Sequence, residues 1–301
     1  MLGQLSDLEL RLLRVFLAVV DAGGVSVAQN SLNVGQSTIS TQLATLETRL
    51  GFKLCERGRG GFRLTGKGER FVELARGLVA TLDDFSAQAR NMDRKLVGHL
   101  RIGMIGHMPE VENNRISQAI TRFRQRDQAV KLTLLVRSPG ELEERLLGNS
   151  LDIAIGYFWH RAPALHFTPF FVEEQVAYCG KDHPLFKQAG NISPETAWAH
   201  QWCWRSYPLP EARFSTPPRD ITAMADNMEA LAMLILSGQH LGFLPQHFAR
   251  PYQAQGALAP LNPALLRYEA MFHLVTRQRP HVSEIARAFL ADLAVPPALT
   301  A

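Results

Sequence analysis

The side chains best suited to chemistry lie at the start of one predicted helix, residues 36–47. They are amides and hydroxyls: Gln36, Ser37, Thr38, Ser40, Thr41 and Gln42. Such groups hydrogen-bond to base edges and phosphates, and the backbone N–H groups of a helix N-terminus attract anions. Ile39, Leu43 and Leu46 recur at helical spacing, which predicts an apolar stripe that packs on neighbouring helices. The pattern favours a helix that contacts nucleic acid, and the alternative is an ordinary solvated surface helix.

Arginines gather on a second segment directly after this helix. Residues 52–57 and 62–64 predict two short strands, and the glycine-rich stretch 58–61 between them predicts a hairpin tip. The basic residues of this hairpin are Arg57, Arg59 and Arg63. Arginines at the base and tip of such a hairpin form a wing that can reach the DNA backbone or the minor groove. The alternative is that they serve only solubility.

Two earlier helices would position the polar one. Ser6 and Glu9 form a capping box at the start of the first, which ends at a pair of glycines. The second would begin at Ser26, with Gln29 three residues on, and a tight turn at 33–35 then leads into the polar helix. A short helix, a glycine-bearing turn and a longer helix with a polar front are typical of a helix-turn-helix.

Spaced residues across this region carry a family resemblance. They are Ala28, Leu32, Gln36, Ser37, Ser40, Leu46, Glu47, Leu50, Gly51, Leu54, Arg57, Leu64, Thr65 and Gly68. Together they resemble the winged helix-turn-helix of LysR-type transcriptional regulators, which implies sequence-specific binding to double-stranded promoter DNA. The sequence departs from the family at Gln29, Asn30 and Cys55. Thr41 stands where a basic residue is common, so the resemblance implies no phosphate contact there.

A long helix is predicted from Thr65, which can cap it, to about Leu96. Apolar residues alternate steps of four and three along it: Phe71, Ala75, Leu78, Leu82, Phe85, Ala89, Met92 and Leu96. This repeat predicts a coiled-coil seam and therefore a homodimer, and the alternative is packing against the chain's own C-terminal domain. In LysR-type proteins the matching helix forms the dimer, so the resemblance implies the same here, with a homotetramer built from two dimers. A dimer presents two recognition helices to half-sites about 34 Å apart.

The remaining chain alternates strand and helix patterns. Apolar strands are predicted at 100–105, 130–136 and 151–155, with helices at 111–126 and 140–148 between them. This alternation predicts a parallel α/β sheet that binds ligands at the C-terminal ends of its strands. A second such unit follows, with strands at 170–179, 200–204, 241–245 and 268–276 and helices at 228–236 and 282–293.

This second half also resembles the LysR type, in its effector domain. The matching residues are Asp152, Ile155, Gly238, Gly242, Leu244 and Pro245. The resemblance implies two Rossmann-like subdomains hinged as in periplasmic binding proteins, with a small-molecule cleft between them and crossovers near Arg161 and Arg267. The predicted fold is therefore α/β, with an N-terminal winged helix-turn-helix, a long linker helix and a periplasmic-binding-protein-like effector domain. The predicted domains are 1–65 for DNA binding, 66–97 for the linker and 98–301 for the effector, with subdomain I at 98–161 and 267–301 and subdomain II at 162–266.

Strand ends and helix starts should line the cleft. The predicted lining is Gly106, His107, Met108, Ser138, Pro139, Gly140, Tyr157, Trp204, Arg205, Asn227 and Phe243. Helix N-termini at Met108 and Gly140 can bind a carboxylate, Arg205 can pair with one bidentately, and the aromatic rings can flank an apolar body. We therefore expect a small anionic, aromatic metabolite. For each residue the alternative is core packing or solvent exposure.

No enzymatic site assembles in the sequence, and no enzyme is predicted. The stretch 103–106 is not a dinucleotide fingerprint, and neither a phosphate loop nor a zinc-protease helix motif occurs. The ten histidines lack metal-ligand spacing, so no catalytic residue, metal or cofactor is predicted. Two alternatives to a ligand-responsive regulator stay open. One is a solute-binding or enzymatic α/β protein that does not bind DNA, and the other is a redox-responsive regulator that uses Cys179 and Cys203.

Composition limits the class of protein. The 301 residues are 46% hydrophobic and 20% charged, which is typical of a folded chain of two or three domains. The net charge is +4, and nine basic against six acidic residues fall in the first seventy. Three cysteines, no secretory leader and no apolar run of membrane length favour a cytoplasmic protein. The expected partners are double-stranded DNA, further copies of the chain, a small-molecule effector and RNA polymerase, with no membrane.

Overall fold

The computed structural model describes residues 6–58, 61–90, 92, 96–126, 128–209, 218, 220–278 and 282–294. The chain divides into two compact units. The first comprises residues 1–99 with two short segments, 129–131 and 147–150, and the second comprises the rest. Among the described helices, none combines the length and the hydropathy that a bilayer crossing requires.

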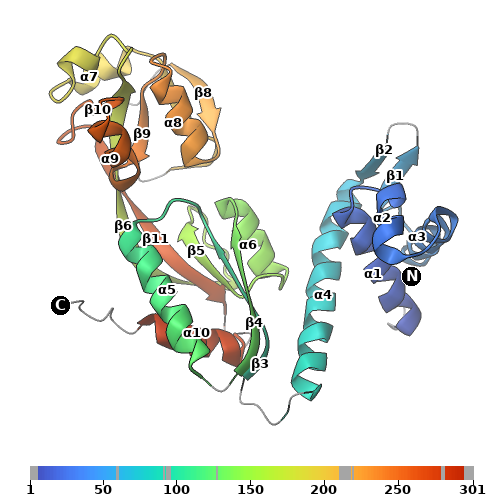
Figure 1. The fold of residues 1–301 in the computed structure, drawn as a ribbon. Helices are drawn as coiled ribbons and strands as arrows, with labels where there is room; N and C mark the ends of the chain where they lie inside the picture. The colour runs from blue at the N-terminus through green and yellow to red at the C-terminus, as the bar shows by residue number, and fades with distance from the viewer. Residues whose placement is uncertain are drawn as a thin grey trace. The chain divides into compact units, whose positions relative to one another are not determined.

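Three helices open the first unit, as predicted (Figure 1): α1 (Asp7–Asp21), α2 (Val25–Leu32) and α3 (Gln36–Leu50). The capping box of Ser6 and Glu9 starts α1. Asn33 takes the left-handed backbone conformation, with φ of 53°, and ends α2, which confirms the tight turn. The predicted start at Ser26 is wrong, because α2 follows Gly24 directly and Ser26 lies inside the helix.

The apolar stripe of α3 packs into the core of this unit. Ile39, Leu43 and Leu46 are buried, together with Leu12 and Phe16 of α1. Burial of one such side chain contributes roughly 1.5–3 kcal/mol, so the stripe fixes which face of α3 is left to solvent. The predicted division of this helix into an apolar and a polar face is confirmed.

The predicted hairpin is present as β1 (Cys55–Gly58) and β2 (Gly61–Leu64), which pair antiparallel. α4 (Gly66–Arg90) follows, and Thr65 caps it because its Oγ1 accepts from the Gly68 N–H at 3.0 Å. A Cβ at Gly68 would lie 1.9 Å from the Leu54 carbonyl oxygen. Only glycine therefore lets the start of α4 approach the wing this closely.

The linker helix is shorter than predicted. α4 ends at Arg90, and Leu96 begins the following strand, where it is buried. Phe71 and Ala75 pack against the core of their own DNA-binding unit, which leaves them little surface for a second chain. The predicted repeat extended to Leu96 because this first residue of the strand falls at the spacing expected for the next apolar position of the helix.

Exposed apolar residues remain along the second half of α4 and just beyond it. Phe85 is 69% exposed, Ala89 is exposed, and Met92, in the turn after the helix, is 84% exposed. Leu78 and Leu82 are half-buried. Leu74, which the prediction omitted, is 69% exposed, and it lies on the face of Phe85 because eleven residues make about three helical turns.

A seven-stranded sheet forms the centre of the second unit, in the order β10-β6-β11-β5-β3-β4 with β9 paired to β6. β3 and β5 run parallel, as predicted, whereas β11 is antiparallel to both β5 and β6. A separate parallel pair is formed by β7 (Trp202–Arg205) and β8 (Ile221–Ala225). The strands of the sheet are β3 (Leu96–Met104), β4 (Gln128–Val136), β5 (Ile153–Tyr157), β6 (Leu165–Gly180), β9 (Gly242–Pro245), β10 (Leu258–Pro260) and β11 (Arg267–Arg277).

Helices flank this sheet in two groups (Figure 1). α5 and α10 pack on each other through Phe123 and Phe289, whose ring centroids are 5.8 Å apart, while α8 and α9 contact β6 and β9. The sequence analysis missed α7, α9, β8 and β10; α9 holds Pro251 in its interior, which argues against a helix when only the sequence is read. The helices are α5 (Glu110–Arg124), α6 (Pro139–Leu147), α7 (Pro194–Trp198), α8 (Met228–Leu236), α9 (Gln246–Ala254) and α10 (Glu284–Ala294), with a 3₁₀ turn at Phe186–Gln188.

The strands β6 and β11 extend through both halves of the sheet. Residues 267–271 of β11 pair with residues 172–176 of β6, and a register shift follows Phe272, where β11 begins to pair with β5. β6 and β11 therefore continue from the part of the sheet beside β5 into the part beside β9 and β10, and the crossovers near Arg161 and Arg267 stay a prediction. The apolar pattern of a long strand is the same along its whole length, so the sequence does not show where its pairing partner changes.

Candidate functional site

The polar residues predicted to contact DNA lie on the outer face of α3. Gln36, Ser37, Thr38 and Thr41 are exposed, whereas Ser40 and Gln42 are half-buried. The Oε1 atom of Gln42 is buried without a hydrogen-bond partner. The four exposed side chains are therefore the ones that can meet a base edge or a phosphate directly.

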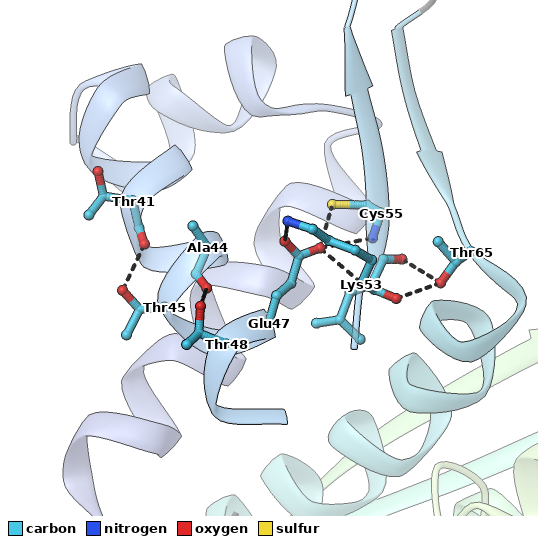
Figure 2. A network of polar contacts seen from close by, with 9 residues as sticks. Thr41, Ala44, Thr45, Glu47, Thr48, Lys53, Cys55 and Thr65 are labelled. Carbon is cyan, nitrogen blue, oxygen red and sulfur yellow. Dashed lines mark hydrogen bonds and ion pairs between the residues drawn. The ribbon is translucent and has the colours of Figure 1, made fainter. Parts of the chain in front are cut away.

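Threonines along α3 bond to their own backbone. The hydroxyls of Thr41, Thr45 and Thr48 donate to carbonyl oxygens one turn earlier at 2.8–2.9 Å, and Figure 2 shows the bonds of Thr45 and Thr48. The hydroxyl proton of Thr41 is thus used inside the helix, which leaves its oxygen lone pairs and its methyl group for contact. In this rotamer Thr41 can accept from a base edge, and it cannot donate to a phosphate.

Glu47 links the wing to α3. Its side chain is buried, and Oε1 accepts from the backbone N–H groups of Leu54 at 2.8 Å and Cys55 at 3.2 Å. Oε2 pairs with Lys53 Nζ at 3.0 Å, and from the other side Thr65 Oγ1 donates to the Lys53 carbonyl at 2.8 Å (Figure 2). These bonds hold the start of β1 against the end of α3, so the helix and the wing are fixed relative to each other.

The wing arginines are only partly described. Arg63 is exposed on β2, opposite Glu56 in the strand register. The backbone of Arg57 pairs with that of Phe62, while the side chain of Arg57 and the whole of Arg59 lie outside the described residues. Arg63 is therefore the wing arginine whose side chain the structure describes, and it is open to solvent.

A large cleft of about 980 Å³ lies at the C-terminal ends of β3 and β4 and at the start of α8. Of the predicted effector residues, Gly106, His107, Ser138, Pro139 and Asn227 line it. Asn227 also caps α8, because its side-chain oxygen accepts from a backbone N–H at 2.9 Å. The structure thus brings together the residues predicted at these strand and helix ends.

A small cavity adjoins the cleft and shares part of its wall. It holds about 20 Å³, which is room for about one water, and its lining includes Tyr157 and Arg205, as predicted. Glu173 and Gln175 also line it, and the sequence analysis missed both. The available signal was their spacing: two polar residues at alternate positions of an apolar strand share one face of the sheet.

Four predicted effector residues lie elsewhere. Met108 is buried and borders a second groove, and Gly140 lies in the first turn of α6 without lining the cleft. Trp204 and Phe243 pack against each other with ring centroids 5.7 Å apart, and Phe243 stacks on Trp202 at 5.3 Å. These rings therefore pack on one another and do not line the cleft.

The two helix N-termini predicted to bind a carboxylate have acidic residues in their first turn. At α6, Glu141 Oε2 accepts from the Ser138 N–H at 3.2 Å and from the Ser138 hydroxyl at 2.9 Å. At α5, Pro109 precedes the helix, and Glu110 and Glu112 stand in its first turn. At α6 the chain's own carboxylate therefore takes the N–H before the helix, whereas at α5 the two acidic residues add negative charge near the positive end of the helix.

Arg205 is the buried cation of the site. It is 6% exposed at the end of β7, and its terminal nitrogens donate to the Tyr207 hydroxyl at 2.7 Å and to Gln175 Oε1 at 2.9 Å. Its Nε has no hydrogen-bond partner. Because buried polar groups are ordinarily paired, an unused donor on a buried cation beside a cavity suits an anionic ligand.

Glu173 is the opposite charge in the same cavity, and it is 5% exposed. Its Oε2 accepts from Gln175 Nε2 at 2.5 Å, while Oε1 lies 3.8 Å from His247 Nε2, beyond hydrogen-bond distance. Burial raises the pKa of Glu173 to about 7, although Arg205 opposes the rise. Burial also lowers the pKa of His247, whose Nε2 donates to the His107 carbonyl at 2.8 Å, so a neutral imidazole faces Glu173.

Side chains from segments far apart in the sequence meet beside the cleft. His107 has a left-handed backbone, with φ of 57°; it pairs through Nε2 with Glu229 and packs edge-on against Phe248 at 4.9 Å between ring centroids. Trp159 stacks on Tyr207 with centroids 5.6 Å apart and ring planes at 8°. These contacts close the cleft beside the small cavity.

The three cysteines are buried. Cys55, Cys179 and Cys203 are free thiols. Burial raises the pKa of Cys179 to about 11 and that of Cys203 to about 12, so neither is a thiolate at neutral pH. This environment does not favour the redox-responsive alternative. The part of the chain that the structure describes contains no cluster of three side chains able to hold a metal ion.

Family models match both parts of the chain. Residues 10–69 match the bacterial regulatory helix-turn-helix protein, lysR family, and residues 93–294 match the LysR substrate binding domain. The HTH-type transcriptional activator BauR of Pseudomonas aeruginosa is 33% identical over 296 residues, which cover 98% of this chain and 97% of that protein. The HTH-type transcriptional regulator MetR of Haemophilus influenzae is 26% identical over 83% of this chain and 81% of its own.

Solved structures share the fold. Full-length CbnR in complex with its target DNA superposes with a TM-score of 0.65 and 20% identity, over 94% of this chain and 98% of that one. ArgP from Mycobacterium tuberculosis superposes with a TM-score of 0.59 and 15% identity, over 97% and 98%. Together with the two matched domains and the relative of equal length, these findings show that the chain belongs to the LysR family of DNA-binding transcriptional regulators and carries its effector-binding domain.

Proposed function

We propose that this regulator reads its operator with the front of α3 and with the wing, under the control of a small anionic metabolite in the cleft. The observation that carries the DNA-binding part is the division of α3. Gln36, Ser37 and Thr38 are exposed, whereas Ile39 and Leu43 are buried in the domain core. Because the buried side fixes the rotation of the helix, the polar front faces outward as a recognition helix requires.

Gln36→Ala and Ser37→Ala test base reading. Each should lower the preference for the operator over a scrambled duplex by about 10- to 100-fold, because a good base contact contributes roughly 1–3 kcal/mol of discrimination. Fluorescence anisotropy with the fragment upstream of the protein's own gene measures this. Thr48→Ala is the matched control, since Thr48 is exposed at the far end of the same helix. Unchanged discrimination in the front variants would remove their base-reading role.

The wing arginines Arg57, Arg59 and Arg63 are proposed to contact phosphates. Replacing Arg63 with Ala should weaken binding to operator and scrambled duplex alike, and it should reduce the slope of log affinity against log salt by about 1. A salt titration of both duplexes measures the slope. A loss confined to the operator would instead make Arg63 a base-reading residue.

We propose a homodimer through the exposed apolar residues of α4 and of the turn after it, and a homotetramer built from two such dimers. Leu74, Phe85 and Met92 support this, since large apolar side chains this exposed ordinarily mark an interaction surface. Phe85→Glu should shift the sedimenting species toward monomer, whereas Val27→Glu, on an equally apolar exposed site of α2, should not. The assembly would act in the cytoplasm, with RNA polymerase as its partner at the promoter.

Arg205 supports the anionic effector, because its unused Nε and its burial beside a cavity leave a positive charge for a ligand to complete. A thermal-shift screen of organic acids should yield stabilising compounds. Arg205→Gln should abolish their effect, and Arg267→Gln, which changes an exposed arginine paired with Glu174, should leave it. Stabilisation that survives Arg205→Gln would place the anion elsewhere.

A further inference from the structure

We infer that the effector is a small zwitterion, whose carboxylate binds Arg205 and whose protonated amine binds Glu173. This inference rests on the proposed function, because it takes the cavity at Arg205 as the place where the effector binds. It adds the second charge of the ligand and names the residue that receives it.

The two buried charges border one cavity without contacting each other. Gln175 lies between them: its Oε1 accepts from Arg205, and its Nε2 donates to Glu173. This amide orientation is the one that satisfies both neighbours, since the guanidinium only donates and the carboxylate accepts. A buried pair kept for stability would be in direct contact, because direct contact is what offsets the desolvation of both ions. The arrangement instead holds the charges one amide apart.

Both charges have unused bonding capacity. The Nε of Arg205 has no hydrogen-bond partner, and Glu173 Oε1 is 3.8 Å from the imidazole of His247. That imidazole already donates its Nε2–H to the His107 carbonyl, so it supplies no proton to Glu173. Arg205 and Glu173 therefore line the same cavity as a cationic donor and an anionic acceptor.

Charge balance then selects the ligand class. A plain carboxylate would satisfy Arg205 but would face the carboxyl of Glu173, and a plain amine would face the guanidinium. A molecule with both groups neutralises both walls, and each contact is a charge-assisted hydrogen bond. The short separation set by Gln175 requires a short carbon chain between the two groups.

The cleft provides the access. The small cavity holds about 20 Å³, and it shares Gly106, His107 and Tyr207 with the cleft of about 980 Å³. The ligand lies where the two join, and its carboxylate replaces the Tyr207 hydroxyl as a partner of Arg205.

Calorimetry on the full-length protein tests the inference with a matched set of compounds. The set comprises ω-amino acids from glycine to the six-carbon member, the unsubstituted carboxylic acids of the same chain lengths, and the corresponding alkylamines. At least one amino acid should bind at least tenfold more tightly than the acid and the amine of its own length. This comparison isolates the contribution of each charged end.

Two variants assign the amine to Glu173. Glu173→Gln should weaken the best zwitterion at least tenfold, and it should leave the affinity for the matched acid equal or higher, because the acid no longer faces a carboxyl. Glu174→Gln, at the neighbouring residue that pairs with Arg267, should change neither. Glu173→Gln removes a buried charge and keeps the shape of the side chain, so it should fold, and a single cooperative thermal unfolding transition verifies this.

Two outcomes would overturn the inference. If the acids bind as tightly as the amino acids and Glu173→Gln has no effect, the ligand is a simple anion, and the proposed function stands without the second charge. If no amino acid of the set binds, the zwitterion is rejected outright. The role of Arg205 is then decided separately, by the organic-acid screen with Arg205→Gln.

Discussion

Buried carboxylates are surrounded in opposite ways in the DNA-binding domain and in the effector cleft. In the DNA-binding domain, Glu47 accepts from two backbone N–H groups and pairs with Lys53. Glu9 likewise accepts from Ser6 and pairs with Arg49. In the cleft, Glu173 accepts one hydrogen bond from Gln175, and its nearby imidazole is turned to another acceptor.

The pKa values follow this difference. The hydrogen bonds of Ser6 lower the pKa of Glu9 to about 2, whereas burial raises the pKa of Glu173 to about 7. The contrast belongs to the cleft and not to the whole second unit, since buried Asp152 there pairs with Arg101 through two contacts of 3.0 Å. Two under-satisfied buried charges that line one cavity indicate a binding site.

The largest effect that sharpens this comparison is expected from Glu47→Ala. It leaves the backbone N–H groups of Leu54 and Cys55 buried without an acceptor, so the DNA-binding domain should lose roughly 3–5 kcal/mol. Thermal unfolding of the full chain, with hydrogen exchange at these two amides, measures the loss. Glu56→Ala, on the exposed face of β1, is the control and should change little. An unchanged unfolding temperature would mean that Glu47 does not hold the wing.

Glu173→Gln should instead stabilise the folded protein at neutral pH. The pKa of Glu173 is raised in the folded protein from 4.5 to about 7, so the folded state binds more protons between these values and stability falls as pH rises. The carboxyl contributes no penalty below pH 4.5, and its full penalty, on the order of 3 kcal/mol, is present above pH 7.

The measurement is the difference in unfolding temperature between Glu173→Gln and the unchanged protein across this pH range. The variant should gain stability with rising pH, and Glu174→Gln should show no such trend. A difference independent of pH would mean that Glu173 is ionised and satisfied in the cleft, and the contrast between the two regions would disappear.

The DNA-binding domain was predictable because its signals are local. The Ser6 capping box, the turn at Asn33, the buried stripe of α3 and the Thr65 cap each depend on residues a few positions apart. The bounds of α8 were also predicted, since an asparagine cap precedes its apolar run. Local spacing records these features because they are made by neighbouring residues.

The remaining features depend on distant parts of the chain. Leu96 continues the apolar phase of α4 yet belongs to a strand, and the register of β6 is set by partners on β11. The role of Arg205 was expected from its type, but its unused Nε depends on Tyr207 and Gln175, which only the fold brings to it. Residue types therefore predicted which side chains are suited to the cleft. Which of their polar atoms lack a hydrogen-bond partner could be found only from the three-dimensional structure.

The smallest effect is expected at Lys53, and it decides what makes Glu47 structural. The Lys53 side chain is 74% exposed although its carboxylate partner is buried, so solvent screens the pair. Lys53→Ala should therefore cost under about 1 kcal/mol, as exposed ion pairs ordinarily do. The same unfolding and exchange measurements apply, and the amides of Leu54 and Cys55 should stay protected while Glu47 still accepts from them. If Lys53→Ala destabilised the domain as much as Glu47→Ala, the ion pair and not the backbone N–H groups would hold the wing. Glu47 would then depend on a cationic partner, as we infer for Glu173. The DNA-binding domain and the cleft would differ only in the source of that cation, which is Lys53 in the first and a ligand in the second.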